Sequence, residues 1–120
     1  MIIALAFAMT TPSALVRAAE PRLCRVVHGR MSATNGNPAL RIWEIGTRHY
    51  LGVDVGQDLS LSTMPRNLRD LWIRQSRGRS LFDASVYGDF RICASKPRRV
   101  GEMEIVRVTA ARHLTVRVNR

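Results

Sequence analysis

The sequence predicts an all-β domain: a small antiparallel barrel or sandwich of about five to seven short strands, with one short helix. Apolar and polar residues alternate over several short segments, and turn residues separate these segments at intervals of about ten positions. A parallel α/β arrangement is disfavoured because its crossovers need several long helices, and only one short segment has helical periodicity.

The first expected strand covers residues 23–33, which are mostly apolar or β-compatible. Turn residues follow over 34–38. Within them, Asn35-Gly36 is a strong hairpin signal because both residue types tolerate positive φ. The chain is therefore expected to reverse here and to pair the first strand with the next one.

Two further strands complete an expected three-stranded meander. Residues 39–45 place Leu40 and Ile42 on one face of a strand, with polar and aromatic residues on the other face. Residues 46–48 (GTR) provide the next turn, and residues 49–55 continue as the third strand.

The middle of the domain is expected to hold a short edge strand over 57–63, followed by the single helix. Three apolar residues at helical spacing predict this helix: Leu68, Leu71 and Trp72. Thr63 is its expected cap, and Pro65 lies near its first turn. Residues 75–80 (QSRGRS) are expected to form an exposed loop.

The last third of the chain has the clearest alternation. Residues 86–93 predict a half-buried strand in which Phe90 and Ile92 point inward, while Asp89 points outward on the same face as Arg91 and can pair with it. The rest is expected to be a loop, a strand, a turn and a strand, in the order 96–101, 102–109, 110–113 and 114–118.

Residues 1–18 are expected to be a secretory signal peptide, which leaves 19–120 as a single β-rich domain. An apolar run opens the chain, and Val16 and Ala18 supply a cleavage site after it. Pro12 interrupts the run before the roughly 20 apolar residues that a transmembrane helix needs. The mature chain is therefore expected to be periplasmic or secreted and to lack a transmembrane helix. The alternative is that the run forms a buried first strand or helix.

Two cysteines, Cys24 and Cys93, are expected to form a disulfide, since exported chains with an even number of cysteines usually pair them. This bridge would close nearly the whole domain and would stabilise it by roughly 4 kcal/mol in the chain-entropy model. The alternative is two buried free thiols.

The chain carries 19 Lys and Arg residues against 9 Asp and Glu residues, a formal net charge of +10. Such an excess is typical of proteins that bind polyanions such as nucleic acid, anionic lipid or lipopolysaccharide. Nearly all of these cations are Arg and they are spread along the chain, a pattern that codon usage in a GC-rich genome also produces. The densest candidate anion-binding group consists of Arg66, Arg69, Arg74, Arg77 and Arg79, with Trp72 among them. The alternative for this group is a solvated surface.

No sequence motif indicates catalysis, a cofactor or a metal site. His28, His49 and His113 are far apart, and each lacks another His or Cys within three positions. The sequence contains no G-x-S-x-G motif and no phosphate-binding glycine loop. A hydrolytic site would have to be assembled from distant residues such as His28, Asp89 and His49.

Several short motifs resemble those of a group of small exported proteins of Gram-negative bacteria. They are HGRMS at 28–32, NG at 35–36, RIW at 41–43, GT at 46–47 and YGDF-x-x-C at 87–93. The resemblance covers roughly residues 24–118 and consists of turn and core residues. It implies a shared fold and carries over no activity and no site residue.

Three functions follow from these observations. The leading one is an exported, disulfide-stabilised β-domain of interaction or structural type, without enzymatic activity and with an unknown partner. The second is a polyanion-binding module that uses the arginine-rich segment 66–79. The third is a small hydrolase with a site assembled from distant residues.

Overall fold

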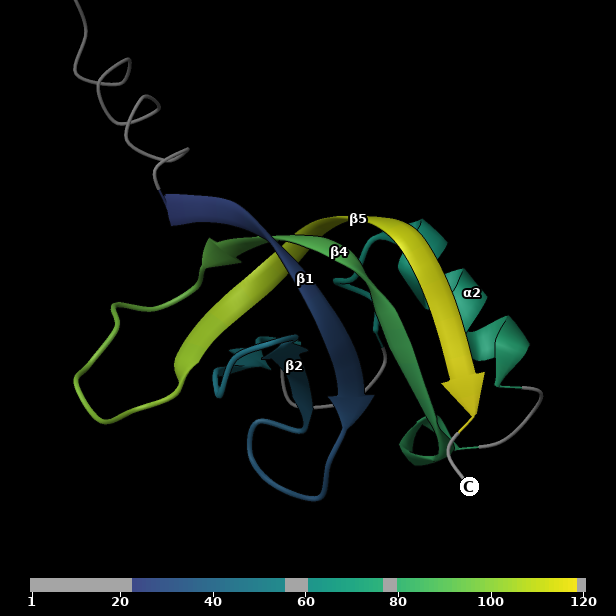
Figure 1. Cartoon of the computed structure of the whole chain (residues 1–120), viewed down its shortest axis with the longest axis horizontal. Helices are drawn as coiled ribbons and strands as arrows, with labels where there is room; N and C mark the ends of the chain where they lie inside the picture. Colours follow the sequence, from purple (N-terminus) through teal and green to yellow (C-terminus); the bar gives the residue numbers. More distant parts are fainter. Residues whose placement is uncertain (1–22, 56–60, 77–79, 119–120) are drawn as a thin grey trace, which may run out of the picture.

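The computed structural model describes residues 23–55, 61–76 and 80–118 (Figure 1). The elements in chain order are β1 (Cys24–Ala33), β2 (Leu40–Glu44), β3 (Tyr50–Val53), α2 (Arg66–Gln75), the 3-10 helix η2 (Leu81–Asp83), β4 (Ala84–Ala94) and β5 (Glu104–Val118). The fold is therefore mostly β, as predicted, with the predicted helix between β3 and β4. No helix in the described part of the chain has the length and apolar character needed to cross a lipid bilayer.

The strands form one mixed sheet in the order β1-β2-β3-β5-β4, and β4 pairs with β1 as well as with β5, so the sheet closes on itself. Every pair is antiparallel except β3 with β5. The prediction of a purely antiparallel sheet is wrong at this pair. Parallel neighbours need a long connection, and α2 together with β4 provides it.

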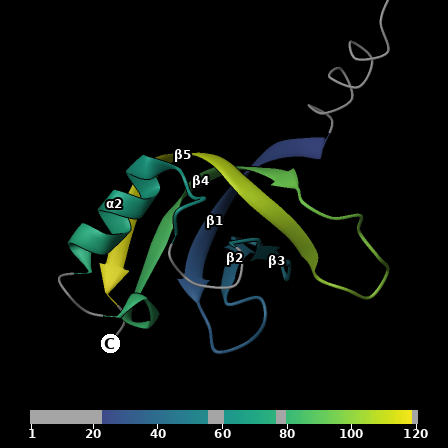
Figure 2. The ribbon, with the colours of Figure 1, turned by 180° about the vertical axis from the view of Figure 1, so that it is seen from behind.

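The core lies inside the closed sheet, and α2 covers one end of it. The inward residues of β2 and β4 are buried, as their alternation predicts. Trp72 of α2 is also fully buried, and its Nε1–H donates to the Ala84 carbonyl at 3.3 Å. This bond offsets the cost of burying a polar N–H. Figures 1 and 2 show α2 along β5, at the opposite end of the sheet from the β4–β5 loop.

Two predictions in the middle of the chain are corrected. The helix starts after Pro65, which takes the N-cap position without a side-chain hydrogen bond, so Thr63 is not the cap. Residues 61–63 form no strand, because a backbone hydrogen bond of 3.1 Å closes a turn there. Residues 56–60 and 77–79, which hold the rest of the predicted edge strand and part of the predicted loop, lie outside the described residues.

The turn predicted at 110–113 is also wrong, because β5 continues through these residues. The strand instead contains a β-bulge: its pairing with β4 shifts register beside Gly88, and His113 adopts a φ of 56°. A Cβ on Gly88 would lie 2.6 Å from Leu114 Cδ2, so glycine allows the bulged strand to approach β4 closely.

Candidate functional site

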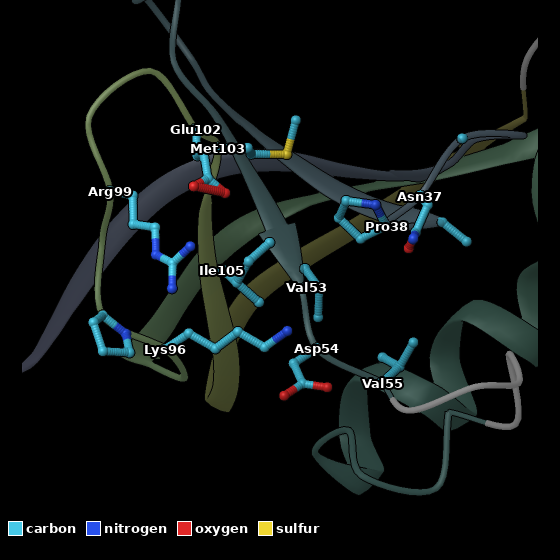
Figure 3. Close-up of a pocket in the computed structure, with 13 residues that line it drawn as sticks. Asn37, Pro38, Val53, Asp54, Val55, Lys96, Arg99, Glu102, Met103 and Ile105 are labelled. Atoms are coloured by element: carbon cyan, nitrogen blue, oxygen red, sulfur yellow. The ribbon is translucent and has the colours of Figure 1, made fainter.

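A cavity of about 1050 Å³ lies between the β1–β2 loop and the β4–β5 loop, next to the end of β3 (Figure 3). We call it the loop groove. Its lining consists of residues 36–39 on one side, 53–55 at its base, and, on the other side, Lys96, Pro97, Arg99, Glu102, Met103 and Ile105.

Gly52 allows the two loops to come together over β3. A Cβ on this residue would overlap Pro38 of the first loop, and it would lie 2.8 Å from Ile105 Cδ1 and 3.3 Å from Met103 Sδ on the other side. The second loop is also tied to β3, because the Ser95 hydroxyl donates to Asp54 Oδ2 at 2.6 Å. The groove is thus built by close packing around a residue without a side chain.

The loop groove carries charges of both signs. Lys96 and Arg99 supply two cations, and Figure 3 shows both side chains directed into the groove. Asp54 and Glu102 supply two carboxylates. None of the described lining residues is aromatic, so the groove offers hydrogen bonds, charges and apolar contacts without a stacking surface.

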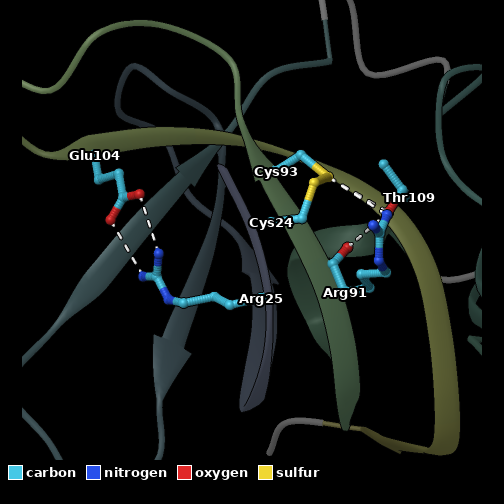
Figure 4. The surroundings of a disulfide bond; sticks show 6 residues. All are labelled: Cys24, Arg25, Arg91, Cys93, Glu104 and Thr109. Atoms are coloured by element: carbon cyan, nitrogen blue, oxygen red, sulfur yellow. Dashed lines mark hydrogen bonds and ion pairs between the residues drawn. A yellow bond between two sulfur atoms is a disulfide. The ribbon is translucent and has the colours of Figure 1, made fainter. Parts of the chain in front are cut away.

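Cys24 and Cys93 form the predicted disulfide (Figure 4). The two residues are direct partners in the β1–β4 ladder. A disulfide is compatible with an oxidising compartment, and it leaves neither sulfur available as a nucleophile or metal ligand.

Two polar contacts flank the disulfide. Arg25 of β1 donates to both carboxylate oxygens of Glu104 at 3.2 and 3.3 Å, and these hydrogen bonds raise the pKa of Arg25 above its usual value. Arg91 Nη1 donates to Thr109 Oγ1 at 2.8 Å (Figure 4). Arg91 thus contacts Thr109, and the predicted Arg91–Asp89 ion pair is absent from the described part of the chain.

Asp89 instead contacts two histidines from the neighbouring strands. Its Oδ1 lies 2.9 Å from His28 Nδ1, and its Oδ2 lies 2.8 Å from His113 Nδ1. We call these three residues the His–Asp–His cluster. Hydrogen bonds from His28 and then His113 lower the pKa of Asp89 below its ordinary value. The cluster faces solvent, with both imidazoles well exposed.

Two of the three distant residues that the sequence offers for a hydrolytic site, His28 and Asp89, belong to this cluster. The third, His49, lies just before β3 and is not part of it. His113 takes that place because the bulge in β5 brings it beside Asp89. The sequence predicts a turn at 110–113, and a turn would not place His113 opposite β4.

A second, shallower cavity of about 520 Å³ lies between α2 and β5, and we call it the helix groove. Its lining consists of Arg66, Asn67, Asp70, Leu71, Arg74, His113 and Leu114. His113 therefore belongs both to the His–Asp–His cluster and to this groove.

The predicted anion-binding group is only partly assembled in the helix groove. Arg66 and Arg74 line it, and Arg69 pairs with Asp70 beside it, at 3.2 Å from Nε to Oδ1. Trp72 is not available to a ligand, because it is buried in the core. Arg77 and Arg79 lie outside the described residues.

The described residues contain no group of three or more His, Cys, Asp or Glu side chains that could hold a metal ion. In the His–Asp–His cluster, the Nδ1 atoms of both rings contact the carboxylate of Asp89.

No family model, no curated protein and no solved structure matches this chain. The resemblance to small exported proteins of Gram-negative bacteria therefore stays a prediction, and the geometry of the two grooves is the basis for assigning a function.

Proposed function

We propose that the protein is an exported, non-enzymatic binding module whose loop groove holds an extended polar segment of a partner protein. The observation that carries this proposal is the groove itself. Two loops, far apart in the sequence, meet over Gly52 and enclose a cavity that offers both cations and carboxylates.

The topology supports the position of the binding site. We take the closed sheet to be a barrel of the OB type, because its strand order is β1-β2-β3-β5-β4 and its helix lies between β3 and β4. OB-folds bind ligands with the face of strands 2 and 3 and with the two loops that form the loop groove here. The likeness to OB-folds indicates only where a ligand binds. The class of ligand is inferred from the residues that line the groove.

The chemistry of the groove favours a peptide ligand over a polyanion. Sites for single-stranded nucleic acid combine basic surfaces with aromatic side chains for stacking, whereas the charges of Lys96 and Arg99 are balanced by Asp54 and Glu102, and the lining has no aromatic residue. A peptide offers backbone donors and acceptors together with charged side chains of both signs. No reaction is proposed for this groove.

Two observations support export. The first is the apolar leader with its cleavage site at Val16 and Ala18, and the second is the disulfide between Cys24 and Cys93. Both fit a periplasmic or secreted protein. We therefore expect the partner to be another exported protein.

The test is a titration of the oxidised, ¹⁵N-labelled protein with a synthetic pool of hexapeptides, followed by two-dimensional NMR. We expect amide shift changes at residues 36–39, 53–55 and 96–103. The double variant Lys96→Ala/Arg99→Ala should lower the affinity for the peptides at least about tenfold, as determined from the amide shift changes. Arg48→Ala/Arg98→Ala is the matched control, because it removes two exposed cations that lie outside the lining.

A parallel titration with cellohexaose and maltohexaose compares a second ligand class. A response to these sugars without a response to the peptides would contradict the peptide assignment. Shift changes that avoid the loop groove would contradict the site.

A further inference from the structure

We infer that the helix groove is a binding site for tetrahedral oxyanions, such as sulfate or phosphate groups, and that it gains affinity when His113 takes up a proton. This site is separate from the loop groove, and it does not depend on the proposed function. The site uses Arg66, Arg74 and His113, whereas the sequence predicted a group of five arginines with Trp72.

The helix groove retains a surplus of positive charge. Arg66 and Arg74 are exposed residues of α2, and both line the groove. Between them lies Asp70, whose carboxylate is paired with Arg69 at 3.2 Å. We place the oxyanion between Arg66 and Arg74, because guanidinium groups are well suited to bind sulfate and phosphate oxygens.

The backbone holds His113 at the edge of this groove. A φ of 56° is uncommon for a residue other than glycine, and here it occurs inside a strand, at the bulge opposite Gly88. The Nδ1–Asp89 hydrogen bond of 2.8 Å fixes the ring as well. Bulges and unusual backbone conformations often re-aim a side chain at a functional site.

The same hydrogen bond determines what His113 can offer to an anion. The lowered pKa of Asp89 keeps its carboxylate ionised near neutral pH, so Asp89 can only accept, and the hydrogen must be on Nδ1 of the ring. In the neutral ring, Nε2 then carries a lone pair and repels an oxyanion. In the protonated ring, Nε2–H becomes a charged donor.

Several charged groups surround His113. They are Asp89 from β4, His28 from β1, Arg112 from β5, and Arg66, Asp70 and Arg74 from α2. Histidine is the residue type in this set whose charge ordinarily changes between pH 5 and 8. His28 shares Asp89 with His113 but does not line the groove, which makes it a matched control.

The test uses sodium sulfate, because its charge stays constant between pH 5.5 and 8.0, unlike that of phosphate. The oxidised, ¹⁵N-labelled full chain is titrated at both pH values and at fixed ionic strength. We expect amide shift changes along α2 and at 111–114, with sulfate affinity about tenfold higher at pH 5.5 than at pH 8.0.

Two variants and their controls test the roles of the residues. His113→Gln should bind sulfate with nearly the same weak affinity at both pH values, whereas His28→Gln should keep most of the pH dependence. Arg66→Gln/Arg74→Gln should lose about tenfold or more in affinity at both pH values. Arg48→Gln/Arg98→Gln removes the same charge from outside both grooves and should leave sulfate binding nearly unchanged.

Three results would overturn the inference: an unchanged pH dependence in His113→Gln, equal losses in the two double-arginine variants, or shift changes located away from the helix groove. The variants' own spectra show whether each has folded. Once the site is established with sulfate, heparin oligosaccharides and phosphatidylglycerol vesicles determine whether a sulfated polymer or a lipid headgroup presents the oxyanion.

Discussion

The two sides of the closed sheet differ in how extensively their strands are paired and cross-linked. On one side, β4 pairs with β1 and β5 along most of its length, and the disulfide joins β1 to β4. On the other side, β2 and β3 are short, and β3 meets β5 over only three residue pairs. We call these the long-strand side and the short-strand side.

Each side carries a different kind of candidate site. The His–Asp–His cluster lies on the long-strand side, where paired strands hold each side chain in place. The loop groove lies at the short-strand side, where two loops form most of the lining. Sites on regular elements are more exactly positioned, while sites on loops adapt more readily to a ligand. The comparison therefore favours a small, defined anion for the helix groove and a variable polar segment for the loop groove.

The largest expected effect comes from removing the disulfide of the long-strand side. Cys24→Ser/Cys93→Ser should lower the free energy of unfolding by roughly 4 kcal/mol, because the bridge closes a loop with a sequence separation of 69 residues. Urea unfolding of the variant and of the oxidised wild type measures this difference. A loss below about 1 kcal/mol would mean that strand pairing alone holds this side.

A smaller effect is expected on the short-strand side from Gly52→Ala. The added methyl group would overlap Pro38 and crowd Ile105, so the two loops must separate, at a cost of about 1–3 kcal/mol. Gly36→Ala is the control, because its methyl group would meet only the flexible end of Arg41 and an ordinary contact with Thr34. Urea unfolding gives the cost, and hydrogen exchange shows where it acts. Faster exchange confined to both loops would support the comparison, while faster exchange in β1 and β4 would contradict it.

The smallest effect concerns Asp89 and depends on pH. Its pKa is lowered in the folded state, so its charged form stabilises the fold above the unfolded-state value of about 3.9, and this contribution disappears as the pH falls through the folded-state value. Asp89→Asn should therefore be less stable than the wild type at pH 6, and the difference should shrink below about pH 4. Urea midpoints from pH 6 to pH 2.5 measure this change. Asp83→Asn, at an exposed residue of η2, is the control, and an equal pH response in both variants would refute the role of the two histidines.

Local sequence patterns were sufficient to predict most of the elements, while the even number of cysteines and the expected export predicted the disulfide. Alternation identified the inward faces of β2 and β4, and Asn35-Gly36 marked the first hairpin loop. Helical spacing located α2. Strand alternation, turn residues and helical spacing depend on neighbours in the sequence, so they can be inferred from one sequence alone.

The remaining features depend on register between distant strands, which local patterns do not encode. Nothing near His113 indicates that a bulge opposite Gly88 brings it to Asp89, and nothing near β3 indicates that its partner is β5. The sequence also does not reveal which way Trp72 faces. It lies among arginines in the sequence, but the helix turns it inward and leaves Arg66 and Arg74 outside.

The pairing of β3 with β5 also determines when the sheet can close during folding. β5 is the last strand, and it supplies partners to both β3 and β4. The sheet therefore cannot close before β5 has formed, and until then β3 and β4 each keep one unpaired edge. A strand of another chain could pair with these edges only before β5 occupies them, so aggregation by edge pairing is confined to the unclosed state.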